Sequence, residues 1–167
     1  MDTLSMFAEA FQYPYPGQID ALHAQTKELK DTPAERELSK FVEKIVPLSL
    51  SEQEELFTRT LDLSPLSAPY VGYHVWGESY KRGEFMAALN KEMKELNVDL
   101  DGELPDHLLP ILRYLHATAT PMPELMSVLD QSLNSMIKSL KKGEEHNPYV
   151  HLFEALAFSF GAVKIEA

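Results

Sequence analysis

Two histidine–carboxylate pairs in the sequence are candidates for chemistry, because metal binding and general acid–base catalysis use this combination. His74 and Glu78 are four residues apart and would lie one above the other on a helix, where they could supply two metal ligands. Asp106 and His107 are neighbours near the expected start of another helix, and such a pair could act as a general base. The alternatives without chemistry are a hydrogen bond on a helix surface for the first pair, and a helix cap by Asp106 beside a half-exposed His107 for the second.

The rest of the sequence speaks against catalysis. It contains no cysteine, which excludes disulfides, thiol nucleophiles and iron–sulfur ligation. It has neither a Gly-x-Ser-x-Gly elbow nor a Gly-x-x-x-x-Gly-Lys phosphate loop, and it lacks the Glu-x-x-His pairs of a two-metal helical bundle. We therefore expect a binding protein rather than an enzyme, with no catalytic residue, no metal and no other cofactor.

A run of carboxylates and a run of aromatic side chains suit the binding of a peptide. Four carboxylates lie within eight residues, with no lysine or arginine among them: Asp99, Asp101, Glu103 and Asp106. Arginines of a basic peptide would pair with them in bidentate fashion. Aromatic side chains recur at helical intervals and could form the wall of a groove: Tyr70, Tyr73, Trp76 and Tyr80. A solvated loop and a stripe of core side chains are the alternative interpretations.

The net charge limits the possible partners. Lys and Arg number 15 against 26 Asp and Glu, which gives −11 at pH 7. No basic stripe is present, so nucleic-acid binding, which needs cations to displace phosphate counterions, is not expected. The N-terminus has no basic and apolar signal sequence, and no apolar run is long enough to span a bilayer. We expect a cytoplasmic protein that does not insert into a membrane.

Helical periodicity dominates the sequence and predicts an all-α bundle of about eight or nine short helices in a single domain, residues 1–167. The segment Tyr70–Trp76 has β propensity, but we assign it to a helix because no partner strand is visible in the sequence. The helices are expected at about residues 4–11, 18–30, 33–45, 51–61, 70–76, 81–97, 105 or 107 to 118, 123–142 and 148–160.

Capping signals suggest several of these boundaries. Thr32-Pro33 joins an N-cap residue to a first-turn proline. Ser51 and Glu54 match a capping box. Lys141-Lys142-Gly143 is typical of a helix C-terminus, with lysines near the negative end of the helix dipole and glycine at C′. Asn147-Pro148 is expected to cap the last helix.

Two segments together resemble a known protein family. The first is Tyr73-His74-Val75-Trp76-Gly77-Glu78-Ser79-Tyr80-Lys81-Arg82-Gly83. The second, about twenty residues further on, is Glu103-Leu104-Pro105-Asp106-His107-Leu108. Their order and distance resemble those of the redox-enzyme maturation chaperones, namely the nitrate reductase delta-subunit group of the NarJ type, which is related to the TorD and DmsD chaperones. The resemblance covers roughly residues 50–116, and Pro110 stands one place later than in the family pattern.

The resemblance implies an all-helical chaperone without a cofactor. Its partner would be the catalytic subunit of a molybdenum oxidoreductase, whose N-terminal leader peptide it would hold while the molybdenum cofactor is inserted. One side of the peptide groove would be lined by Glu103, Pro105, Asp106 and His107. The opposite side would carry Tyr73, His74, Trp76 and Glu78, together with Arg82. The chain would act as a monomer or as a domain-swapped dimer.

Two other hypotheses remain open at this point. The chain could be a metal-dependent helical-bundle enzyme that uses His74, Glu78 and His107. It could also be an acidic regulatory adaptor with an unrelated partner. A stoichiometric metal would favour the enzyme, whereas co-purification with a molybdenum subunit would favour the chaperone.

Overall fold

The computed structural model describes residues 3–64 and 67–166, with side chains up to Gly161. The described residues form α-helices and no strand, so the predicted all-α class is confirmed. The helices are α1 (Thr3–Ala10), α2 (Gln18–Thr26), α3 (Pro33–Ile45), α4 (Leu50–Phe57), α5 (Val71–Trp76), α6 (Tyr80–Glu95), α7 (Leu108–Ala117), α8 (Pro123–Glu144) and α9 (Tyr149–Glu166). A 3₁₀ turn, η1 (Lys27–Leu29), extends α2, and a π-helical turn, η2 (Thr58–Asp62), extends α4.

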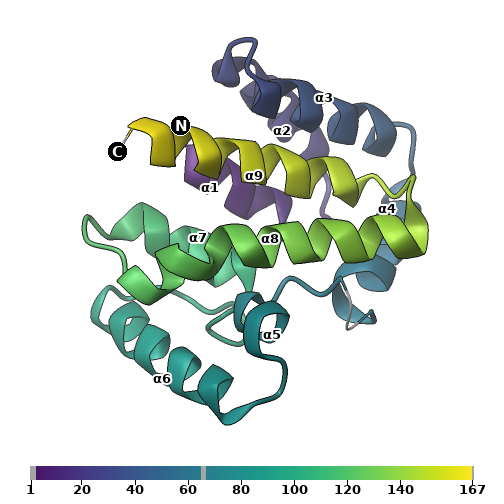
Figure 1. The fold of residues 1–167 in the computed structure, drawn as a ribbon. Coiled ribbons are helices and arrows are strands. Elements are labelled where there is room, and N and C mark those ends of the chain that lie inside the picture. Colours follow the sequence, from purple (N-terminus) through teal and green to yellow (C-terminus); the bar gives the residue numbers. More distant parts are fainter. Residues whose placement is uncertain (1–2, 65–66, 167) are drawn as a thin grey trace.

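Helix α9 is the central element of the bundle. It lies between α3 and α8, while α1 packs on α7 and α5 packs on α8 (Figure 1). Phe158 is the one exposed side chain among those described for α9, and the others are buried or partly buried. Two of them make ring contacts with other parts of the bundle: Phe153 with Phe11, just after α1, at 5.6 Å and Tyr149 with Phe41 of α3 at 5.1 Å between centroids. None of the described helices has both the length and the apolar character needed to cross a membrane.

Two of the four predicted boundaries are confirmed. Thr32 caps α3, because its hydroxyl accepts a hydrogen bond from the Glu35 N–H at 3.1 Å, and Pro33 occupies the first turn. Asn147 precedes α9, and its side-chain oxygen accepts a hydrogen bond from the Tyr149 N–H at 2.8 Å. The Asn147 amide also donates to the Thr60 hydroxyl at 2.8 Å, which ties the start of α9 to η2.

The other two boundaries were predicted wrongly. The capping box that starts α4 is formed by Ser49 and Glu52, not by Ser51 and Glu54. The pattern Ser-x-x-Glu occurs twice in this stretch, two residues apart, so the sequence alone does not decide between them. Helix α8 also continues through Gly143 to Glu144, so that glycine is helical and does not occupy the C′ position.

The end of α4 is not a regular α-helix, because its last turn is π-helical. The chain widens into η2, where the Leu63 N–H donates to the Thr58 carbonyl five residues earlier at 3.0 Å. Arg59 holds this turn by ion pairs to Glu144 of α8 at 2.7 Å and to Glu55 of α4 at 3.1 Å. Such π-turns are rare and frequently lie at functional sites.

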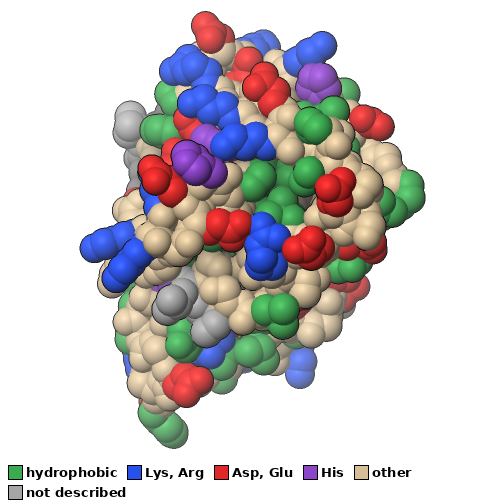
Figure 2. Space-filling view, turned by 90° about the vertical axis from the view of Figure 1, so that its right-hand side faces the viewer, with side chains coloured by type: hydrophobic (Ala, Val, Ile, Leu, Met, Phe, Trp, Pro, Cys, Tyr) green, Lys and Arg blue, Asp and Glu red, His purple; other side chains and the backbone are tan. Residues whose placement is uncertain are grey.

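The surface around this end of the bundle carries mixed charge. On the face drawn in Figure 2, acidic and basic side chains are interspersed around a hollow in which hydrophobic side chains are visible. The acidic excess of the chain is therefore not gathered into one patch on this face.

Candidate functional site

The two segments that carry the family resemblance lie side by side. The Val71 N–H donates to the Asp106 carbonyl at 2.8 Å, and the Leu108 N–H donates to the Pro69 carbonyl at 2.9 Å. Between these bonds, Tyr70 and His107 form an isolated antiparallel bridge. The start of α5 is thereby joined to the loop that leads into α7, although the two are more than thirty residues apart in sequence.

A buried ion pair joins the same region to α6. Asp106 is completely buried, and only 14% of the Arg82 side chain is exposed. The guanidinium donates twice to the carboxylate, from Nε to Oδ2 at 2.9 Å and from Nη2 to Oδ1 at 3.2 Å. A third bond comes from the backbone N–H of Gly72 to Oδ2 at 3.1 Å. Asp106 therefore does not cap α7, as the sequence had suggested, but holds α5 and α6 together.

Two tyrosines flank the guanidinium of Arg82. Its Cζ atom lies 5.6 Å from the ring centroid of Tyr70 and 5.6 Å from that of Tyr73, within the range of cation–π attraction. The Tyr70 hydroxyl donates a short hydrogen bond of 2.6 Å to Glu103. Burial and this bond to Glu103 raise the pKa of Tyr70, so the hydroxyl stays protonated as a donor.

These groups border a surface pocket with a volume of about 310 Å³. Its lining residues come from η2, α5, α6 and the connecting loops: Asp62, Leu63, Ala68, Tyr70, Tyr73, Arg82 and Leu104. Tyr73 and Arg82 belong to the predicted set, and Glu103 adjoins the pocket through Tyr70. Asp62 and Leu63 were not predicted, because they reach the pocket through the π-turn, which leaves no periodicity signal in the sequence.

The charge at this pocket is negative. Asp62 is exposed, but partial desolvation of its carboxyl and the charge of nearby Glu103 raise its pKa, so the two carboxylates repel each other. Arg82 is the one cation among the described lining residues, and Asp106 already neutralises it. A positively charged group entering the pocket would relieve the repulsion between Asp62 and Glu103.

His107 is a structural residue rather than an exposed base. It is 3% exposed, and its Nδ1 accepts a hydrogen bond from the Leu109 N–H at 3.0 Å, so His107 and not Asp106 caps α7. Its Nε2 lies 4.0 Å from Glu103, and its ring meets that of Tyr70 edge-on at 5.1 Å. Burial lowers the pKa of His107 to about 4, which keeps the imidazole neutral. The expectation of a half-exposed His107 was wrong.

His74 and Glu78 do not form the predicted pair on one helix. Helix α5 ends at Trp76, and Gly77 follows with φ of 65°, a conformation that favours glycine. His74 instead links α5 to its surroundings, with Nε2 2.9 Å from the Ala68 carbonyl and Nδ1 3.2 Å from the Ser135 hydroxyl of α8. Glu78 is exposed in the turn after the helix. The structure therefore does not gather His74, Glu78 and His107 around one point.

The remaining predicted residues have separate surroundings. Trp76 packs on Phe85 of α6 with 5.0 Å between ring centroids, outside the pocket lining. Pro105 is partly exposed and follows Leu104, which lines the pocket.

The four carboxylates of the acidic run, residues 99–106, also have different surroundings. Asp99 accepts a hydrogen bond from the Asp101 N–H at 2.8 Å, and Asp101 lies 3.9 Å from Arg113. Of these four carboxylates, Glu103 adjoins the pocket through its hydrogen bond from Tyr70, whereas Asp106 is buried.

No family model matches the chain, and no curated protein matches it. The geometry of the pocket therefore carries the functional argument.

The first prediction concerns Gly72. A Cβ atom there would lie 2.7 Å from Asp106 Oδ2 and 3.0 Å from Arg82 Cγ, too close for either to stay in place. We expect Gly72→Ala to destabilise the protein by about 1–3 kcal/mol, because it forces the ion pair apart. Gly83→Ala is the matched control on α6, since a Cβ there meets nothing within 4 Å. It should stabilise by about 0.5–1 kcal/mol. Chemical denaturation of both variants checks this, and equal shifts would contradict it.

The second prediction concerns the pH dependence of stability. The unfolded chain protonates His107 near pH 6.5, but the folded chain does so only near pH 4. Between these values the unfolded state binds more protons, so stability falls as the pH is lowered, by up to about 3 kcal/mol. His107→Asn keeps a capping side chain without a titrating group. Denaturation of both proteins from pH 7 to pH 4 should show the stability of the wild type falling more steeply. Parallel curves would show that His107 does not contribute.

Proposed function

We propose that this chain is a binding protein of the redox-enzyme maturation chaperone type. It holds the N-terminal leader peptide of the catalytic subunit of a molybdenum oxidoreductase while the molybdenum cofactor is inserted. The bound segment occupies the pocket between η2, α5 and α6. The observation that carries this proposal is the pocket itself, which has tyrosine walls, Asp62 in its lining and Glu103 beside it on the Tyr70 hydroxyl. The chain performs no reaction of its own and acts in the cytoplasm as a monomer or a domain-swapped dimer.

The pocket suits a peptide that carries both an arginine and apolar side chains. Asp62 and Glu103 attract the guanidinium, and charge-assisted hydrogen bonds to carboxylates are among the stronger ones. Leu63 and Leu104 are 73% and 47% exposed. Exposed hydrophobic side chains that gather at the edge of a pocket are typical of a surface that contacts a partner. In such an arrangement the carboxylates accelerate association, while apolar anchors slow dissociation.

Two of the motif residues support the pocket without lining it. Asp106 fixes Arg82, and Arg82 lies against both tyrosines. His107 caps α7 and lies against Tyr70. In this proposal Asp106 and His107 position the recognition surface, and Tyr73, Leu104 and the rim carboxylates contact the peptide.

The other two hypotheses receive less support. The metal-dependent enzyme requires His74, Glu78 and His107 to meet, but the two histidines bond to other groups and Glu78 is exposed. An adaptor for an unrelated partner would use the same pocket, since a basic segment from any protein meets the same carboxylates. Affinity capture from the native host separates the two, because the chaperone co-purifies with a molybdenum subunit.

The third prediction tests peptide binding directly. Calorimetric titration with arginine-bearing leader peptides of the host's molybdenum subunits should show one peptide bound per chain, with affinity falling as salt rises. Leu104→Ser should weaken binding by removing an apolar anchor. Asp62→Asn should weaken it and also reduce the salt dependence. Both residues are exposed, so neither change should unfold the protein.

The matched control is Tyr80→Ala, which removes an 85% exposed aromatic side chain of α6 outside the pocket lining. It should leave the affinity unchanged. If Leu104→Ser and Asp62→Asn behave like this control, the pocket is not the peptide site.

A further inference from the structure

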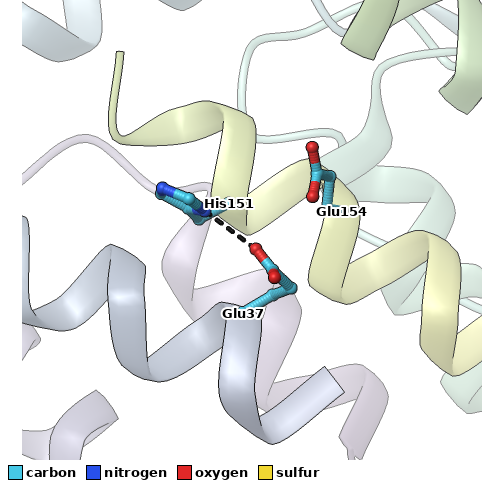
Figure 3. Close-up of side chains that lie close together, drawn as sticks. All are labelled: Glu37, His151 and Glu154. Carbon is cyan, nitrogen blue, oxygen red and sulfur yellow. Dashed lines mark hydrogen bonds and ion pairs between the residues drawn. The ribbon is translucent and has the colours of Figure 1, made fainter. Parts of the chain in front are cut away.

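A second group of polar side chains lies far from the pocket in sequence, where α3 packs on α9. Glu37 of α3 faces His151 of α9, and Glu154 lies one turn further along α9 (Figure 3). Within the described part of the chain, these three are the one group of at least three potential metal ligands, with ligand atoms all within 4.8 Å of one another. His151 and Glu154 are three residues apart and so project from the same side of their helix.

The group combines partial burial with access to solvent. The Glu37 side chain is 14% exposed, that of His151 20% and that of Glu154 23%. His151 Nδ1 already lies 2.8 Å from Glu37 Oε2. An ion can therefore enter from solvent, and the packing of α3 on α9 restricts how far its ligands can move.

The donor set suits a transition metal. One imidazole nitrogen and two carboxylate oxygens are ligands that zinc accepts, with bonds of about 2.0–2.2 Å. Tetrahedral ligands at that distance are about 3.4 Å apart. The three ligand atoms already lie within 4.8 Å of one another, so small side-chain rotations bring them to that spacing. Magnesium and calcium prefer oxygen ligands alone, which makes them poorer candidates.

Two lysines form ion pairs with these carboxylates. Lys40 lies 3.1 Å from Glu37 Oε1, and Lys141 of α8 lies 2.8 Å from Glu154 Oε1. Both lysines are about half exposed, at 54% and 51%, so they can turn into solvent when an ion replaces them. They compete with the metal and set its affinity.

We propose that Glu37, His151 and Glu154 bind a divalent transition-metal ion of the zinc class. The ion joins α3 to the central helix α9 and leaves a fourth position open to water. This site was not predicted, because His151 and Glu154 stand 114 residues or more from Glu37. It is independent of the peptide pocket and differs from the expectation that the chain binds no metal.

The fourth prediction tests this site on the full chain after treatment with a chelating resin. Titration with zinc chloride should show one ion bound per chain, and zinc should raise the melting temperature, because it binds only the folded state. Cobalt should give visible absorption bands typical of tetrahedral coordination. Glu37→Gln and His151→Gln should each weaken zinc binding more than tenfold, since even outer-shell partners of a metal ligand are worth about 10–100-fold. Removal of both lysines, Lys40→Ala with Lys141→Ala, should tighten it.

The controls distinguish this site from unspecific binding. His23→Gln removes an exposed histidine of α2 and should leave zinc affinity unchanged, and magnesium should produce no heat. Circular dichroism confirms that the isosteric Glu37→Gln variant is folded. Absence of zinc binding, or zinc binding that survives both Glu37→Gln and His151→Gln, overturns the proposal.

Discussion

A carboxylate that loses all contact with water remains ionised only if a cation and hydrogen bonds replace its hydration. Asp106 is in this position, and Arg82 and the Gly72 N–H supply the replacement. The three residues come from the loop before α7, from α6 and from α5, so the requirements of one buried charge fix the relative positions of three segments. The Arg82 guanidinium in turn lies against Tyr70 and Tyr73, which form a wall of the pocket.

The site thus has a buried frame and an exposed rim. The frame is made of the residues that make the sequence resemble a chaperone family, above all Asp106 and the neutral His107. The rim is made of residues outside the two motif segments, such as Asp62 and Leu63. A division of this kind lets rim residues change without disturbing the ion pair. Substitution of a frame residue is therefore expected to lower the free energy of unfolding first, and to weaken peptide binding only as a consequence.

Helical periodicity was sufficient to predict the fold class. The short helix Val71–Trp76 has an aromatic composition that favours a strand, and it was assigned correctly because the sequence offers no partner strand. The sequence was insufficient where two equal signals competed, as at Ser49 and Ser51, and where the helix changed type, as in the π-turn that carries Asp62. For the candidate site, the sequence singled out two motif segments, which the structure brings side by side. It did not show that Asp106 is buried, because burial depends on the cation that packing brings to it from α6.

A double-mutant cycle on Asp106 and Arg82 tests most directly whether this ion pair organises the site. The variants are Asp106→Asn, Arg82→Met and their combination, each measured by equilibrium unfolding at pH 7. Removing one partner of a buried pair leaves the other uncompensated and costs about 3–5 kcal/mol, whereas removing both costs less than the sum. We expect a coupling energy of at least about 2 kcal/mol, within the range found for residues in contact. Additive effects of the two substitutions would contradict the account.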